Sequence, residues 1–118
     1  MTRRFPSSVY DRGSEPDPRF SLANERTFLA WIRTSLALFG AGVALEALEV
    51  PVDQPFRLAS AALFVGLGLV GTVQAWVGWL RSERALREQR PLPGPSVGLV
   101  LTIGLAVAAV VLVVGYLR

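Results

Sequence analysis

The chain has no cysteine, no histidine and no lysine among its 118 residues. Without cysteine it forms no disulfide and has no thiol chemistry, and without histidine it lacks the commonest metal ligand. All twelve basic residues are therefore arginine. Either the base composition of the genome or selection for planar, permanently charged donors explains this bias.

Three long apolar runs make up most of the chain, at about 32–50, 58–80 and 97–117. Each run is close to the roughly 20 residues that an α-helix needs to cross the hydrocarbon of a bilayer. The sequence therefore predicts an all-α integral membrane protein with three transmembrane helices. The first run is not expected to be a cleaved signal, because a charged segment of about thirty residues precedes it.

The amino-terminal residues 1–18 hold three prolines and show no sustained apolar period, which predicts a flexible cytoplasmic arm. A three-helix membrane domain is expected over 19–118, with spans at about 28–49, 58–80 and 96–117. The first helix is expected to begin near Asp17 and Pro18, with Ser21 as a competing cap slightly later. It is expected to extend into the cytoplasm before it enters the membrane.

The distribution of arginine predicts the orientation. Arginines lie before the first span and in the connection after the second span, whereas the connection 46–54 has none. Because basic residues stay on the cytoplasmic side, the amino terminus is expected inside and the carboxy terminus outside. Membrane topology thus explains the net charge of +3, and no nucleic-acid partner is predicted.

Small residues recur at a spacing of four in each span, as in Gly40 with Ala44, Gly71 with Ala75, and Gly104 with Ala108. Such positions let helix backbones approach closely in a bilayer. The spacing does not distinguish packing within one chain from packing between subunits. Because three spans enclose little space, a homo-oligomer is expected, surrounded by membrane lipids.

Arg26 and Arg33 are seven residues apart, where the first helix enters the membrane. This spacing leaves them about 20° from alignment and about 10 Å apart along the helix axis, so they form one basic stripe. Glu25 projects roughly 100° away from Arg26 and is expected to find its partner on another helix or subunit.

Several interpretations of this stripe stay open, among them a purely structural salt bridge. The arginines either extend toward the phosphates of cytoplasmic lipids, or several subunits present them to a shared axis as guanidinium donors for an oxyanion. Supporting polar side chains are predicted at Asn24, Thr27, Thr34 and Gln74. Gln74, inside the second span, is expected to donate a hydrogen bond to a neighbouring helix. The run 81–88 is expected to continue the second helix and to bind anionic headgroups.

The sequence contains no motif of an enzyme. The segment 66–71 has the letters of a dinucleotide-binding loop, but it lies inside an apolar span and does not follow a strand. No catalytic residue, metal ligand or cofactor is therefore expected.

Residues 23–34 read ANERTFLAWIRT. This segment resembles the hallmark of the YidH-like family of bacterial inner-membrane proteins, the domain of unknown function two-zero-two. The resemblance covers about residues 17–118 and implies a small multi-pass protein of the bacterial plasma (inner) membrane. It names no activity.

The same domain is similar to the membrane part of the vacuolar transporter chaperone complex, a eukaryotic polyphosphate polymerase. This resemblance implies several three-helix subunits around a basic pore that handles polyphosphate. It carries Glu25 and Arg26 over as pore-ring residues and adds Arg81, whereas Arg33 belongs to the bacterial form of the motif. The chain lacks a soluble polymerase domain, so it is not expected to make polyphosphate alone.

Together these features predict an oligomeric, non-catalytic membrane protein. It would bind an oxyanion (phosphate or polyphosphate) or an anionic lipid through Arg26, Arg33 and Arg81. The alternative hypothesis is an accessory or scaffold subunit of another membrane protein complex, in which the arginines serve only topology.

Overall fold

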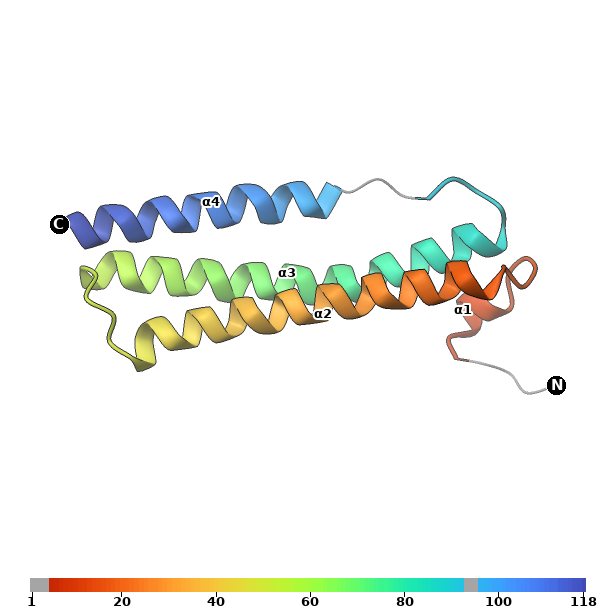
Figure 1. The fold of residues 1–118 in the computed structure, drawn as a ribbon, viewed down its shortest axis with the longest axis horizontal. Coiled ribbons are helices and arrows are strands. Elements are labelled where there is room, and N and C mark those ends of the chain that lie inside the picture. Colours follow the sequence, from red (N-terminus) through yellow and green to blue (C-terminus); the bar gives the residue numbers. More distant parts are fainter. Residues whose placement is uncertain (1–4, 93–95) are drawn as a thin grey trace.

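The computed structural model describes residues 5–92 and 96–118. In this part of the chain the elements are α1 (Ser7–Tyr10), α2 (Pro18–Ala47), α3 (Gln54–Arg87) and α4 (Ser96–Leu117), and no strand occurs there. The last three helices run antiparallel in an elongated bundle of 61 × 26 × 20 Å (Figure 1). Each of these three is long and apolar enough to cross a bilayer. The predicted all-α fold with three transmembrane helices is confirmed.

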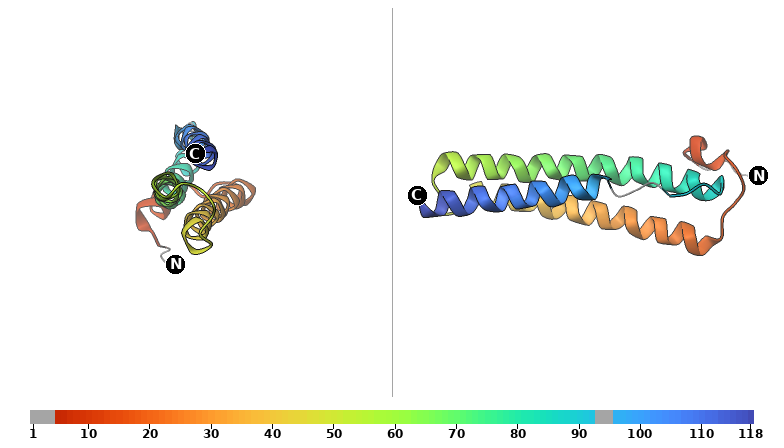
Figure 2. Two further views of the ribbon diagram at one scale, coloured as in Figure 1. Left: turned by 90° about the vertical axis from the view of Figure 1, so that its left-hand side faces the viewer. Right: turned by 90° about the horizontal axis from the view of Figure 1, so that it is seen from above.

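The central helix of the bundle is α3. Both α2 and α4 pack along it, while the backbones of α2 and α4 do not approach each other. The end-on view in Figure 2 shows this angular arrangement. The apolar core is correspondingly small and consists of Leu38, Leu67 and Leu101, one from each helix, with Trp31 and Phe64 packed against it.

Small residues allow the close approach of α3 to its two neighbours. A Cβ atom added to Gly71 would lie 2.5 Å from Ser35 Oγ on α2, and one added to Gly104 would lie 2.5 Å from Leu67 Cδ2. These glycines therefore serve packing within the chain. Gly40 differs, because an added Cβ atom would meet nothing within 4 Å.

The start of α2 follows the predicted signals. Asp17 is the N-cap and accepts a hydrogen bond of 2.9 Å from the backbone N–H of Arg19, with Pro18 as the first helical residue. The Arg19 side chain also donates to this carboxylate, and together these bonds hold the pKa of Asp17 below its usual range.

The end of α3 lies at Arg87, so residues 81–87 are helical, as expected for the continuation of the second helix. A short reversal follows. Gln89 has a φ of 54°, and the backbone N–H of Arg90 donates to Ala85 O over 2.8 Å. This is the hydrogen-bonding pattern of a Schellman cap, and it turns the chain back along α3.

The amino-terminal segment packs against the end of α3, from Phe5 onward. Val9 has no exposed surface, and the Arg87 guanidinium lies 4.8 Å from the centre of the Tyr10 ring. Arg87 Nη2 also pairs with Glu15 Oε1 at 2.5 Å. Residues 5–17 thus form a docked segment in the structure, and residues 1–4 of the arm predicted over 1–18 lie outside the described residues. The sequence shows no local period here because contacts distant in the chain hold the segment.

Candidate functional site

Six arginines gather at one end of the bundle. We call this the basic end and define it as residues 18–26 of α2 together with residues 79–90. Its arginines are Arg19, Arg26, Arg81, Arg84, Arg87 and Arg90. The opposite end holds Arg57 and Arg118.

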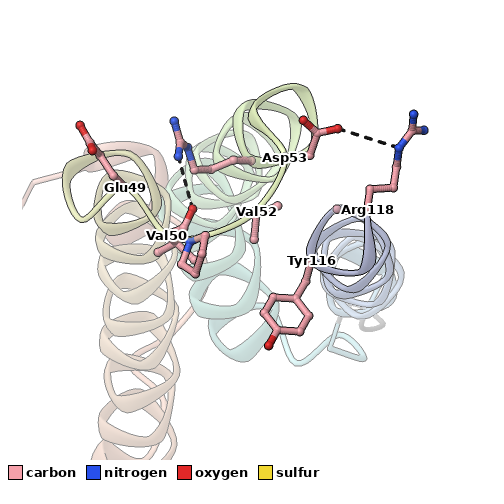
Figure 3. A pocket seen from close by; sticks show the side chains of 9 residues that line it. Glu49, Val50, Val52, Asp53, Tyr116 and Arg118 are labelled. Carbon is pink, nitrogen blue, oxygen red and sulfur yellow. Dashed lines mark hydrogen bonds and ion pairs between the residues drawn. The ribbon is translucent and has the colours of Figure 1, made fainter.

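At the opposite end, a pocket of about 650 Å³ lies between the α2–α3 connection and the end of α4. Arg118 and Asp53 face each other there, with Nε 3.9 Å from Oδ2 (Figure 3). Arg57 pairs with Glu46 at 3.3 Å and donates to Val50 O. Because both arginines have carboxylate partners, this pocket offers no free guanidinium to an anion.

Arg26 and Arg33 lie on the face of α2 that points away from α3. At 100° per residue they are about 140° or more around the helix from the mean direction of its buried positions, and both side chains are exposed. Neither has a hydrogen-bond or ion-pair partner among the residues that the structure describes. The structure therefore places the predicted basic stripe on the outside of the three-helix unit.

The two arginines differ in depth. About 20 Å of helix separates Arg33 from Glu46, and about 30 Å separates Arg26 from Glu46. Since the hydrocarbon of a bilayer is about 30 Å thick, a span that ends near Glu46 has Arg26 at its boundary. Arg33 then lies about 10 Å inside.

A groove of about 410 Å³ separates α2 from α4 beside this stripe. Arg26, Thr27, Ala30, Trp31 and Thr34 line it from α2, and Gly98 and Leu101 line it from α4. The structure thus brings the predicted Arg26, Thr27 and Thr34 to one groove. Arg33 is not among its lining residues.

Glu25 lies on the other side of α2. It lines a second pocket, of about 320 Å³, with Phe28, Trp76 and Trp79, which Phe5, Pro6 and Tyr10 of the amino-terminal segment complete. Glu25 is exposed and has no hydrogen-bond or ion-pair partner in residues 5–92 and 96–118. As expected from helix geometry, it does not pair with Arg26.

Asn24 lies between α2 and α3 and does not line the groove beside Arg26. It is 8% exposed, and its Nδ2 donates to Trp79 O and to Glu83 Oε1, each over 3.2 Å. Ser21 Oγ donates to the other oxygen of Glu83 over 2.8 Å. These bonds join α2 to α3 at the basic end.

Glu83 and Arg87 are buried charged residues that the sequence patterns did not predict. The Glu83 side chain is 3% exposed, although it lies in a run of charged residues. The available signal was the spacing, because Ala75, Trp79, Glu83 and Arg87 recur every four residues and all four are buried.

Arg81 lines a separate pocket of about 280 Å³, together with Arg84, Ala85, Arg90 and Pro91. Within one chain, the three arginines predicted to bind an anion therefore do not form one site. Gln74 lies over Gly78 of its own helix. The hydrogen bond expected from Gln74 to a neighbouring helix is absent from the described residues.

In the part of the chain that the structure describes, no group of three or more acidic residues could hold a metal ion. What the basic end offers chemically is three guanidinium groups, those of Arg26, Arg81 and Arg84, without carboxylate partners among the described residues, whereas Arg19, Arg87 and Arg90 are paired. Such donors favour phosphate and other oxyanions.

The fold and these charges define a small, helical, multi-pass membrane protein. Residues 19–85 match the domain of unknown function DUF202, and the chain belongs to this family. It is 43% identical over 100 residues to the inner membrane protein YidH of Escherichia coli K12, covering 84% of this chain and 87% of YidH. It is also 43% identical over 100 residues to an uncharacterised protein of Mycobacterium tuberculosis, covering 82% of this chain and 80% of that protein.

A more distant relative is subunit 2 of the vacuolar transporter chaperone complex of Toxoplasma gondii. It is 32% identical over 103 residues, which are 80% of this chain but 7% of that protein. No solved structure matches this chain significantly. Both resemblances inferred from the motif are confirmed, and the chain is an inner-membrane protein of a family without an assigned function.

Proposed function

We propose that this protein forms a homo-oligomer in the inner membrane and binds an oxyanion through Arg26 and Arg33. The observation that carries this proposal is the pair of exposed, unpaired guanidinium groups on the outer face of α2. Arg33, about 10 Å inside the hydrocarbon, carries part of the roughly 2.5–3.5 kcal/mol by which an arginine at the bilayer centre raises the free energy of insertion on translocon scales. A face that lines a hydrated path between subunits avoids this cost.

The charges of Glu25 and Arg26 support an assembly of identical subunits. They project to different sides of α2, and both lack a partner within the described chain. A second copy whose Glu25 side meets the Arg26 side of the first gives both groups a partner, and repetition of this contact closes a ring. A carboxylate uses two of the five N–H donors of a guanidinium, so Arg26 keeps donors for an anion, and Arg33 has no such carboxylate beside it. The likeness to a subunit of the vacuolar transporter chaperone complex supports assembly as well.

The mechanism would be electrostatic recognition without covalent chemistry. Guanidinium groups donate two parallel hydrogen bonds to phosphate oxygens, and a ring of them along an axis favours phosphate, polyphosphate or an anionic lipid headgroup. Thr27 and Thr34 add hydroxyl groups in the adjoining groove. Arg81, at the same end of the bundle, adds to the positive potential.

The test is binding of inorganic phosphate and polyphosphate to the full chain in nanodiscs, measured at two salt concentrations. Arg26→Gln and Arg33→Gln should each weaken binding about tenfold, the loss expected for one charge-assisted hydrogen bond. Arg118→Gln is the control, because it removes an exposed arginine at the opposite end of the bundle, away from the stripe. Unchanged binding in the Arg26→Gln/Arg33→Gln double variant would reject the proposal.

An accessory role is the second candidate, and Gly40 is the observation that favours it. This glycine leaves open space on α2, where a helix of another membrane protein could approach closely. Purification after mild solubilisation distinguishes the two functions. A scaffold should retain a different membrane protein, and Gly40→Leu should release it, whereas the proposed anion-binding oligomer contains one kind of subunit.

A further inference from the structure

We infer that the pocket at the end of α3 binds the phosphate group of an anionic phospholipid. The pocket has a volume of about 280 Å³ and is lined by Arg81, Arg84, Ala85, Arg90 and Pro91. Its residues differ from those of the α2 stripe, so this site does not depend on the proposed oligomeric oxyanion site.

Two segments build the pocket. Arg81 and Arg84 belong to the last turns of α3, whereas Arg90 comes from the chain after the helix. The reversal at Gln89, with its φ of 54°, and the Arg90 N–H bond to Ala85 O return Arg90 to the helix. The Schellman cap thereby brings a third guanidinium group to a pocket that α3 alone would supply with two.

The charges around this pocket are unbalanced. Arg90 Nη2 pairs with Glu88 Oε1 at 3.2 Å, but Arg81 and Arg84 have no carboxylate partner among the described residues. Arg84 Nε is also buried without a hydrogen-bond partner. A buried donor of this kind is normally satisfied by a protein group, water or a ligand. A phosphate oxygen in the pocket supplies the missing acceptor.

An apolar groove lies on the same face of α3 as Arg84, nearer the middle of the helix, and makes a lipid the favoured source of the phosphate. This groove has a volume of about 350 Å³ and is lined by Leu69, Val70, Val73, Gln74, Val77 and Val97. Val77 and Arg84 are seven residues apart, so they lie within about 20° of each other on the helix and about 10 Å apart along it. The arrangement matches a phospholipid, with a charged headgroup above an acyl chain.

The depth of the pocket agrees with this occupant. The Trp76 and Trp79 rings stack on each other with centroids 5.6 Å apart, and tryptophan favours the boundary between hydrocarbon and headgroups. Arg81 and Arg84 lie about 3 Å and about 8 Å beyond Trp79 along the helix axis. This is the layer in which lipid phosphates lie.

The experiment measures which lipids stay bound to the full chain after purification, by native mass spectrometry from mixed phosphatidylglycerol and phosphatidylcholine nanodiscs. The wild type should retain phosphatidylglycerol preferentially. Arg84→Gln should reduce this retention about tenfold, as expected for the loss of a charge-assisted donor. Arg19→Gln, which removes an exposed arginine from the same end of the bundle, should have no effect.

Two further variants distinguish the sources of phosphate. Val73→Trp fills the apolar groove, so it should reduce lipid retention without changing the affinity for inorganic phosphate. Equal retention of both lipids by the wild type would overturn the inference. The inference would also be overturned if Arg84→Gln weakened the binding of inorganic phosphate but Val73→Trp changed neither phosphate binding nor lipid retention. In that case the pocket would bind free phosphate and not a lipid.

Controls for folding and for the other site complete the design. Helix content by circular dichroism must match the wild type in each variant. Arg84→Lys, which keeps a charge but loses the planar fork, should retain an intermediate amount of phosphatidylglycerol even if Arg84→Gln fails to fold. The double variant Arg26→Gln/Arg33→Gln should retain phosphatidylglycerol as the wild type does. Loss of oxyanion binding at the α2 stripe and loss of lipid binding at this pocket are therefore measured independently.

Discussion

Asn24 on α2 and Glu83 on α3 are joined by a hydrogen bond of 3.2 Å between Nδ2 and Oε1, and both side chains are buried. This bond joins the two helices at the basic end and agrees with the rotation set by the buried residues farther along α2. With Asn24 turned inward, the 100° step per residue turns Glu25 to one side of α2 and Arg26 to the outer face. Asn24 thus binds α2 to α3, whereas Glu25 and Arg26 remain available for contacts outside the chain.

The first prediction concerns this buried bond. Asn24→Ala leaves the Glu83 carboxylate with one fewer donor in a buried position, which should lower the free energy of unfolding by about 1–3 kcal/mol. Thermal unfolding in detergent measures the effect. Thr27→Ala is the control, because Thr27 Oγ1 is exposed and donates only to Ala23 O of its own helix. Equal stability of the Asn24 and Thr27 variants would contradict the assigned role.

The second prediction concerns the docked amino-terminal segment. Arg87, at the end of α3, is 4% exposed and contacts Glu15 and Tyr10 of this segment. Arg87→Ala removes these contacts, so residues 5–17 should become much more sensitive to a soluble protease while the three long helices stay protected. Arg12→Ala, which removes an exposed arginine, should leave the cleavage rate unchanged. Slow cleavage in both variants would show that other contacts hold the segment.

The third prediction tests the proposed contact between subunits. Glu25→Arg and Arg26→Glu each place like charges at that contact and should reduce the oligomer population in native mass spectrometry. The double variant Glu25→Arg/Arg26→Glu restores opposite charges and should recover the oligomer. Because the two residues do not pair within one chain, recovery has to come from a neighbouring subunit. Additive losses in the double variant would argue against the ring.

The fourth prediction tests the orientation. The absence of cysteine makes single labels simple to introduce, and Ser14 and Gln54 are exposed at opposite ends of the bundle. With the basic end in the cytoplasm, as arginine distribution favours, a membrane-impermeant thiol reagent should label Gln54→Cys in intact cells. Ser14→Cys should react only after the membrane is opened. The reverse pattern would place the amino terminus outside.

Much of the fold could be predicted because its signals are local. A run of about 20 apolar residues is long enough to cross the hydrocarbon, and this requirement holds whatever the neighbouring helices do. The basic stripe of Arg26 and Arg33 was likewise predictable, since a seven-residue spacing brings two side chains to one face of any α-helix. The hallmark segment was local as well, and it was sufficient to identify the family.

The contacts at the basic end could not be predicted from local patterns. Asn24 and Glu83 are 59 residues apart in the sequence, and Arg87 and Glu15 are 72 apart. A run of mixed charge such as 81–88 is typical of a solvated helix, and its sequence alone does not distinguish Arg81 from the buried Arg87. That distinction depends on which face of α3 meets α2 and the amino-terminal segment.

The sequence by itself therefore determined the membrane class, the three spans and the stripe on α2, because bilayer thickness and helix geometry act on each segment separately. Only the tertiary structure decided that Asn24 holds α2 to α3, that Glu15 docks on Arg87, and that Arg81 belongs to a pocket apart from Arg26. These relationships depend on the rotation and register of packed helices. Side chains distant in the sequence determine both.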